Sequence, residues 1–137
     1  MLAASVETLR SCGVSNSKAR YLRELAEFAL VNNLEELSDA SDDAVRATLT
    51  AIPGIGKWTC DMFLLFYLER EDVLPVENGA FRQAFNWLYG ASVENEGVRT
   101  VVCNLWKPHS STAVRYLYRA INMGLVTAQP ASEIVAK

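Results

Sequence analysis

Residues 52–59 (IPGIGKWT) constrain the fold of this chain more than any other segment. The apolar residues before them recur at the i, i+3, i+4, i+7 spacing of one helix face. They are Val45, Thr48, Leu49 and Ile52. Pro53 should end that helix, because its ring crowds the preceding turn and it has no N–H to donate. A second apolar segment of helical length follows over residues 59–68. The sequence therefore predicts two helices joined by a short glycine turn.

The turn itself has the features of a phosphate site. Gly54 and Gly56 allow positive φ and leave no side chain between the backbone and an incoming group. The helix that follows begins with unpaired N–H groups at the positive end of its dipole, which is an arrangement that binds anions. The alternative is that the glycine turn is only a tight connection. The proline before it and Lys57, Trp58 and Thr59 behind it favour the phosphate site.

Length and composition are those of a single domain over residues 1–137, since half of the residues are hydrophobic and a substantial core is available. No apolar run is as long as a membrane span and no leader pattern is present. We therefore expect a soluble, cytoplasmic protein with no membrane partner. The formal charge of −3 argues against a strongly electrostatic nucleic-acid binder and confines any DNA contact to one face.

Apolar stripes at helical spacing recur along the rest of the chain, and no alternating strand pattern is present. The stripes lie at residues 22–29, 81–88, 98–105 and 114–121, and Ser41 precedes residues 42 and 43 as a helix-capping residue. The fold should be all-α, a compact bundle of about six or seven short helices with these stripes as core faces. Cys12, Cys60 and Cys103 are widely spaced, so we expect reduced core residues rather than disulfides or metal ligands.

Three ordered segments together resemble a known family. Residues 49–59 (LTAIPGIGKWT) resemble the hairpin of the helix-hairpin-helix DNA glycosylases, and residues 72–80 (DVLPVENGA) resemble the loop that carries their catalytic carboxylate. The segments 106–111 (WKPHSS) and 116–119 (YLYR) resemble the closing pattern of the same family. The closest branch is 3-methyladenine DNA glycosylase II, the alkylation-repair type.

This resemblance implies a function in base-excision repair. The family binds double-stranded DNA, flips a damaged base out of the stack and cleaves its N-glycosidic bond, while a carboxylate stabilises the oxocarbenium-like sugar. By resemblance, DNA-backbone binding falls to Pro53, Gly54, Ile55, Gly56, Lys57 and Thr59. The base pocket would include Trp58, Trp106 and His109.

The resemblance also predicts the type of reaction. Lyase-type members carry a Schiff-base lysine at the second residue after the last hairpin glycine. That residue is Trp58 here, and Lys57 comes one position early. An active form should therefore be monofunctional and leave the strand uncut. An indole at this place also offers an electron-rich face to a cationic base; the alternative is a core tryptophan.

By resemblance, Asn78 occupies the position of the family's catalytic Asp. A neutral amide can cap a helix, but it lacks the negative charge that the transition state needs, and losing such a group commonly costs about a hundredfold or more in rate. Glu77 is no substitute, because it lies about 100° away around a helix. We therefore expect an impaired glycosylase. The alternatives are a non-catalytic helix-hairpin-helix DNA-binding module and a helical interaction domain without DNA affinity.

Two further expectations come from the resemblance. Family domains begin with additional helices that contribute to the base pocket, and this chain is expected to start after them, which would expose apolar surface on its N-terminal side and favour self-association. No cofactor is required. The carbonyls of Thr50, Ile52 and Ile55 would hold a monovalent cation at the hairpin.

Overall fold

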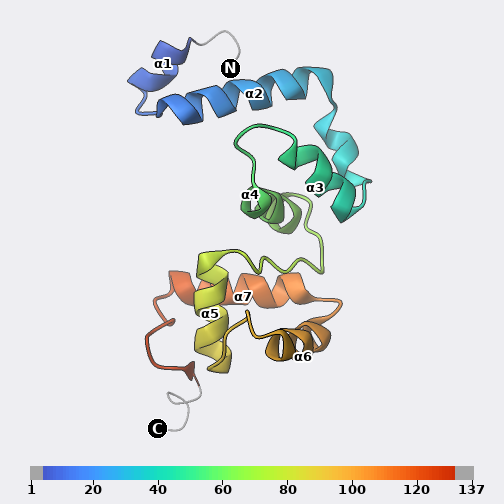
Figure 1. The fold of residues 1–137 in the computed structure, drawn as a ribbon, viewed down its shortest axis with the longest axis vertical. Helices are drawn as coiled ribbons and strands as arrows, with labels where there is room; N and C mark the ends of the chain where they lie inside the picture. Colours follow the sequence, from blue (N-terminus) through green and yellow to red (C-terminus); the bar gives the residue numbers. More distant parts are fainter. Residues whose placement is uncertain (1–4, 132–137) are drawn as a thin grey trace. The chain divides into compact units, whose positions relative to one another are not determined.

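The computed structural model describes residues 5–131 and is all-helical over that range, as the sequence predicts (Figure 1). Its elements are α1 (Val6–Ser11), α2 (Asn16–Val31), the 3₁₀-helix Leu34–Ser38, α3 (Asp42–Thr50), α4 (Lys57–Met62), the π-helix Phe63–Tyr67, α5 (Gly79–Tyr89), α6 (Glu96–Trp106) and α7 (Ser110–Asn122). Within the described range there are thus seven α-helices, and the expected number is confirmed.

The chain forms two compact units, Met1–Cys60 and Asp61–Lys137. The first contains α1, α2, α3 and the hairpin turn. The second contains the π-helix, α5, α6 and α7. The expectation of one domain over residues 1–137 stays a prediction.

Hydroxyl caps begin α2 and α3; the sequence predicts the cap at Ser41, and the structure adds the cap at Ser15. The Ser15 side chain accepts the Lys18 N–H (3.3 Å) at the start of α2, and the Ser41 side chain accepts the Ala44 N–H (3.3 Å) at the start of α3. The apolar stripe of α2 is less buried than predicted, because Ala19 is the only buried residue of this helix. Leu22 and Leu25 instead line an open apolar groove.

The sequence predicts one helix in the apolar segment after the hairpin, but the structure has two helices of different kinds there. α4 begins at Lys57, and from Phe63 the chain widens into a π-helix, in which the Leu68 N–H donates to the Phe63 carbonyl five residues back (2.9 Å). Leu64 and Leu65 are both completely buried. The exposed side of this helix is aromatic, since Phe66 is 52% exposed and Tyr67 is 66% exposed.

The core of the second unit lies where α5 packs against α7 (Figure 1). Its buried residues include Phe81, Ala84, Phe85, Val114 and Leu117, which confirms most of the predicted stripes of these two helices. Leu88, the last residue of the predicted α5 stripe, is 37% exposed. Gly90 ends α5 in the left-handed conformation (φ +62°).

The prediction for α6 is wrong in part. Val102 is its only buried residue, while Val101 (60% exposed) and Leu105 (73% exposed) face solvent. α6 packs on α7, but this contact leaves most of the apolar stripe of α6 outside the core.

None of the three cysteines forms a disulfide, and only Cys60 is a core residue. Cys12 is exposed and Cys103 is half-buried. The described residues contain no cluster of three or more His, Cys, Asp or Glu side chains that could hold a metal ion. No helix between residues 5 and 131 is long and apolar enough to cross a membrane.

Candidate functional site

The hairpin turn is anchored from the inside and open on the outside. Ile52 (2% exposed) and Cys60 (fully buried) fix its two ends in the core of the first unit. Two turn hydrogen bonds shape it: the Ile52 N–H donates to the Leu49 carbonyl (3.1 Å), and the Ile55 N–H donates to the Ile52 carbonyl (3.1 Å). Pro53, Gly54 and Gly56 are exposed. The turn can therefore be reached by a partner in solution.

The two hairpin glycines have different roles, which the sequence does not reveal. Gly54 has positive φ (+87°), as expected, but its bare Cα is covered by the protein itself: an added Cβ would lie 2.2 Å from Cγ of the Tyr21 ring. Gly56 does not adopt positive φ, and nothing lies within 4 Å of an added Cβ. Both glycines allow positive φ, but only Gly54 adopts it, and only Gly56 has open space where a side chain would stand.

Backbone donors are available at this corner. Within the described part of the chain, the N–H groups of Gly54 and Gly56 have no hydrogen-bond partner. The first hydrogen bond of α4 runs from the Cys60 N–H to the Gly56 carbonyl (3.1 Å), so the Trp58 and Thr59 N–H groups lie ahead of the helical ladder. An anion at this corner would meet several donors and no carboxylate from the turn itself.

The side chains that follow the turn are accessible. Lys57, Trp58 and Thr59 are all exposed, and Trp58 is 56% exposed. The alternative of a core tryptophan at this position is therefore wrong.

In the second unit, Asn78 is the N-cap of α5. Its side-chain Oδ1 accepts the Phe81 N–H (2.8 Å), and its own N–H donates to the Pro75 carbonyl (2.9 Å). The residue is half-buried. The predicted capping role is confirmed, and the side chain at this position is held in place by the first turn of the helix. A carboxylate here would accept the same N–H and lie at the positive end of the helix dipole.

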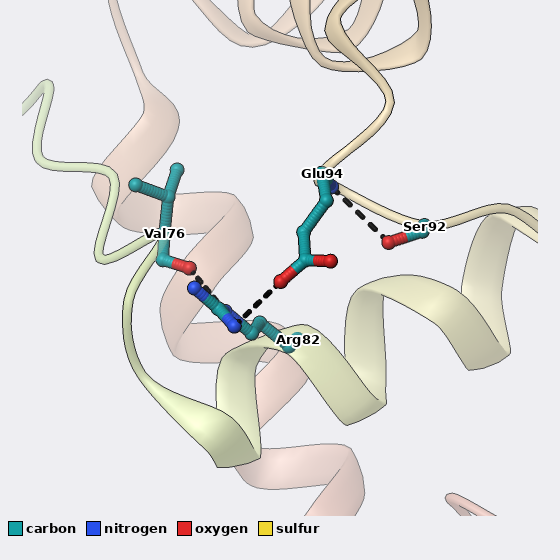
Figure 2. A network of polar contacts seen from close by, with 4 residues as sticks. All are labelled: Val76, Arg82, Ser92 and Glu94. Carbon is teal, nitrogen blue, oxygen red and sulfur yellow. Dashed lines mark hydrogen bonds and ion pairs between the residues drawn. The ribbon is translucent and has the colours of Figure 1, made fainter.

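Arg82 holds the loop before Asn78 against α5. Figure 2 shows its Nε donating to the Val76 carbonyl (2.7 Å) while Nη1 pairs with Glu94 Oε1 (2.7 Å). The Glu94 N–H in turn donates to Ser92 Oγ (3.1 Å). One guanidinium thus ties the loop, the helix and the turn after the helix together.

The start of α7 holds the segment before the loop. Ser111 Oγ accepts the Val73 N–H (2.9 Å), and the Ser111 N–H donates to the Glu71 carbonyl (3.0 Å). Ser110 Oγ donates to Asp72 Oδ1. Both serines are buried, at 2% and 4% exposure. The resemblance covers these serines, but nothing in the sequence shows that they reach back 38 residues.

Trp106 belongs to an aromatic cluster of the second unit. Its ring lies edge-on to Phe81 (6.4 Å between centroids) and Phe85 (6.0 Å), and its Nε1 donates to Tyr89 Oη (3.0 Å). His109 is exposed and stands at the N-cap of α7 without a side-chain capping bond. The structure thus places Asn78, Trp106 and His109 in one unit and the hairpin residues in the other. Their roles in a base pocket stay a prediction.

Tyr118, which belongs to the YLYR segment at residues 116–119, has an unusual environment. Its hydroxyl is buried without a hydrogen-bond partner among the described residues, and its ring lies 6.2 Å from that of Phe66. Burial, with a smaller contribution from the negative charge of Asp61, raises the pKa of Tyr118 to about 12.

Comparison with known proteins places this geometry in context. The HhH-GPD superfamily of base excision DNA repair proteins matches residues 1–108. The chain is similar to DNA-3-methyladenine glycosylase 1 of Schizosaccharomyces pombe, with 36% identity over 86 residues, which cover 61% of this chain and 38% of that protein. It is also similar to DNA-3-methyladenine glycosylase 2 of Escherichia coli, with 27% identity over 118 residues that cover 86% of this chain and 40% of that protein.

Two solved structures share the fold. A DNA-3-methyladenine glycosidase from Bacillus halodurans has a TM-score of 0.81 at 31% identity, covering 98% of this chain and 64% of that one. The 3-methyladenine DNA glycosylase of Schizosaccharomyces pombe, solved in complex with abasic DNA, has a TM-score of 0.74 at 28% identity, covering 87% of this chain and 60% of that one. The chain thus spans less than two thirds of the length of each of these four proteins. Because the family match extends over most of its residues, the chain belongs to the HhH-GPD superfamily of base excision DNA repair proteins.

Proposed function

We propose that this chain acts in base-excision repair: it binds duplex DNA through the hairpin and carries the scaffold of a monofunctional glycosylase for alkylated bases. The observation that carries the proposal is the placement of Asn78, which caps α5 through its Oδ1 in the loop that resembles the one carrying the family's catalytic Asp. The relatives named above are 3-methyladenine glycosylases, and one was solved with abasic DNA, which supports this substrate class.

DNA binding would use the open side of the hairpin. A phosphate oxygen would accept hydrogen bonds from the Gly54 and Gly56 N–H groups, and Lys57 would add charge to the contact. Such contacts fix the register of the protein on the duplex without reading its sequence. This is the expected mode for a protein that must inspect many sites.

Base release would depend on charge at position 78. As the N-glycosidic bond of a flipped, damaged base breaks, the sugar becomes positively charged, and a carboxylate beside it stabilises that charge or activates the attacking water. The Asn78 amide keeps the capping bond of α5 but supplies no charge. The exposed indole of Trp58, where lyase-type relatives have lysine, would leave the strand uncut and offer its face to a cationic base.

Paired base-release assays on alkylated duplex DNA test this proposal. Restoring the carboxylate with Asn78→Asp should raise the release rate about a hundredfold or more. Asn95→Asp is a matched control, because Asn95 caps α6 in the same way (Val98 N–H, 3.2 Å) and the change adds the same charge. Release without strand cleavage in the Asn78 variant alone supports the glycosylase scaffold.

The second candidate is a non-catalytic DNA-binding module, and Asn78 itself favours it. In that case neither variant releases bases, while both bind duplex DNA as the natural chain does. A helical interaction domain would show no duplex binding at all. The same protein preparations therefore separate the three functions.

We also propose a monovalent cation at the hairpin, held by the backbone carbonyls of Thr50, Ile52 and Ile55. The residues fit such an ion: Thr50 ends α3, and the Ile52 carbonyl accepts one N–H, which leaves its second lone pair for a metal. The ion would screen a DNA phosphate. Replacing Na⁺ or K⁺ with a bulky organic cation at equal ionic strength should then weaken duplex binding; equal affinities in all three salts would contradict the site.

Self-association is a further part of the proposal. The first unit has an apolar groove of about 300 Å³ lined by Tyr21, Leu22, Leu25 and Ile55, among others, and Val31 at the end of α2 is 86% exposed. Exposed apolar surface of this kind favours association. Sedimentation that shows one species of constant mass at all concentrations would contradict it.

A further inference from the structure

The loop that ends at Asn78 is held at its start by α7. The bond between Ser111 Oγ and the Val73 N–H spans 38 residues and is buried, with Val73 at 1% and Ser111 at 4% exposure. Ser111 also donates its own N–H to the Glu71 carbonyl (3.0 Å). Backbone groups on both sides of residue 72 are therefore bound to one serine.

The path from this clamp to Asn78 is short and stiff. Pro75 is fully buried, and its ring fixes φ. The Val76 N–H donates to the Leu74 carbonyl (3.0 Å), and the Asn78 N–H donates to the Pro75 carbonyl (2.9 Å). A displacement of Val73 is therefore passed along this turn to Asn78 rather than absorbed in a flexible loop.

We propose that Ser111 is a positioning residue for position 78: by binding Val73 and Glu71 it holds the side chain of residue 78 at the N-terminus of α5. Arg82 fixes the same loop at Val76, so the clamp and the cap hold its two ends. The expected effect on base release rests on the proposed glycosylase function, whereas the expected effect on the cap of α5 does not.

Removing the hydroxyl should loosen the cap. In Ser111→Ala the buried Val73 N–H loses its acceptor, and a buried donor without a partner is unfavourable enough to drive a local shift. We expect faster hydrogen exchange at the Phe81 amide, which the Asn78 side chain protects, with no comparable change in the amides of α2. Thr112→Ala is the matched control, because Thr112 is exposed on the same helical turn and its side chain has no hydrogen bond to a described residue.

A second variant guards against a folding defect. Ser111→Cys keeps the shape of the side chain but offers only a weak acceptor, so it should also speed exchange at Phe81. The proposal is overturned if the Phe81 amide exchanges at the natural rate in a folded Ser111→Ala or Ser111→Cys protein. It is also overturned if exchange rises equally across both units, since a uniform rise would mean that Ser111 contributes only to the stability of the whole chain.

The activity readout is taken in the Asn78→Asp background. Adding Ser111→Ala should lower kcat for base release roughly 10- to 100-fold, as expected for a displaced catalytic group. Duplex affinity, measured separately, should not change, and the stoichiometry of duplex binding counts the folded protein. If Asn78→Asp releases no base, the proposed function fails, and the Phe81 exchange still decides the role of Ser111. An unchanged kcat in an active double variant would overturn the catalytic consequence.

Discussion

Gly54 and Gly56 look equivalent in the sequence, but they answer different physical requirements. The Tyr21 ring and the positive φ both exclude a side chain at Gly54, whereas Gly56 has open space around its Cα. A glycine can thus be required by the packing of its own protein or by the approach of a partner. Only the neighbours of its Cα decide which applies.

This difference predicts opposite phenotypes for two alanine substitutions. Gly54→Ala should lower the free energy of unfolding by about 2 kcal/mol or more, because the methyl group meets the Tyr21 ring and the backbone is strained. Gly56→Ala should leave stability nearly unchanged. It should weaken duplex binding about tenfold, because the methyl group would keep the phosphate from the N–H and so remove one hydrogen bond to a charged group. Urea unfolding and fluorescence anisotropy measure the two effects. Unchanged affinity in Gly56→Ala would place the DNA contact elsewhere.

Tyr118 predicts a pH dependence of stability. Its pKa is raised to about 12 in the folded protein, while an unfolded tyrosine ionises near its ordinary value of about 10. The unfolded state therefore loses its proton first, and stability present below pH 10 is lost as the pH rises from about 10 to about 12. Tyr118→Phe should flatten this decline in urea unfolding and remove the latest step of the ultraviolet tyrosine titration. An identical decline in the variant would contradict the assignment.

At the scale of elements, the loop before α5 is held by bonds to backbone atoms more than by charge pairs. Arg82 makes both kinds of contact, to the Val76 carbonyl and to the exposed carboxylate of Glu94. Ion pairs between exposed side chains contribute little, whereas a bond that fixes a loop carbonyl also orders the segment around it.

Two substitutions separate these contributions. Arg82→Ala should cost about 1–2 kcal/mol of unfolding free energy, because it removes a hydrogen bond to the backbone as well as the ion pair. Glu94→Gln removes only the ion pair and should cost at most about 0.5 kcal/mol. Urea unfolding of both variants gives the comparison. Equal losses would mean that the ion pair is the principal contact.

At the scale of the whole molecule, a net charge of −3 limits how DNA can be bound. A duplex approaching an acidic protein must meet a local donor surface, and the hairpin offers backbone amides with Lys57 beside them and Lys18 at the rim of the neighbouring groove. Backbone amides carry no formal charge. Binding through them releases few counterions.

We therefore expect a shallow salt dependence of duplex affinity. With one or two phosphates neutralised, the slope of log K against log salt concentration should be about −1 to −2. Anisotropy titrations at several salt concentrations measure it, and Lys57→Ala should reduce the slope further. A slope several times steeper would indicate a broad basic surface in place of the hairpin.

The sequence by itself determined the class of fold, the two helices around the glycine turn, the caps at Ser41 and Asn78, and the family. These features depend on local chemistry: the helical period, the missing N–H of proline and the short side chains that accept N–H bonds. Each is readable from residues a few positions apart.

Only the tertiary structure decided which apolar residues are buried and what holds the loop at Asn78. The exposed Val101 and Leu105 of α6, the Tyr21 ring over Gly54 and the clamp of Ser111 on Val73 all depend on residues brought together from distant parts of the chain. An apolar stripe indicates that a helix face can be buried, but another surface of the protein must pack against that face to bury it. A serine hydroxyl can likewise accept a hydrogen bond, but only the packing of α7 brings the Ser111 hydroxyl to its donor, the Val73 N–H.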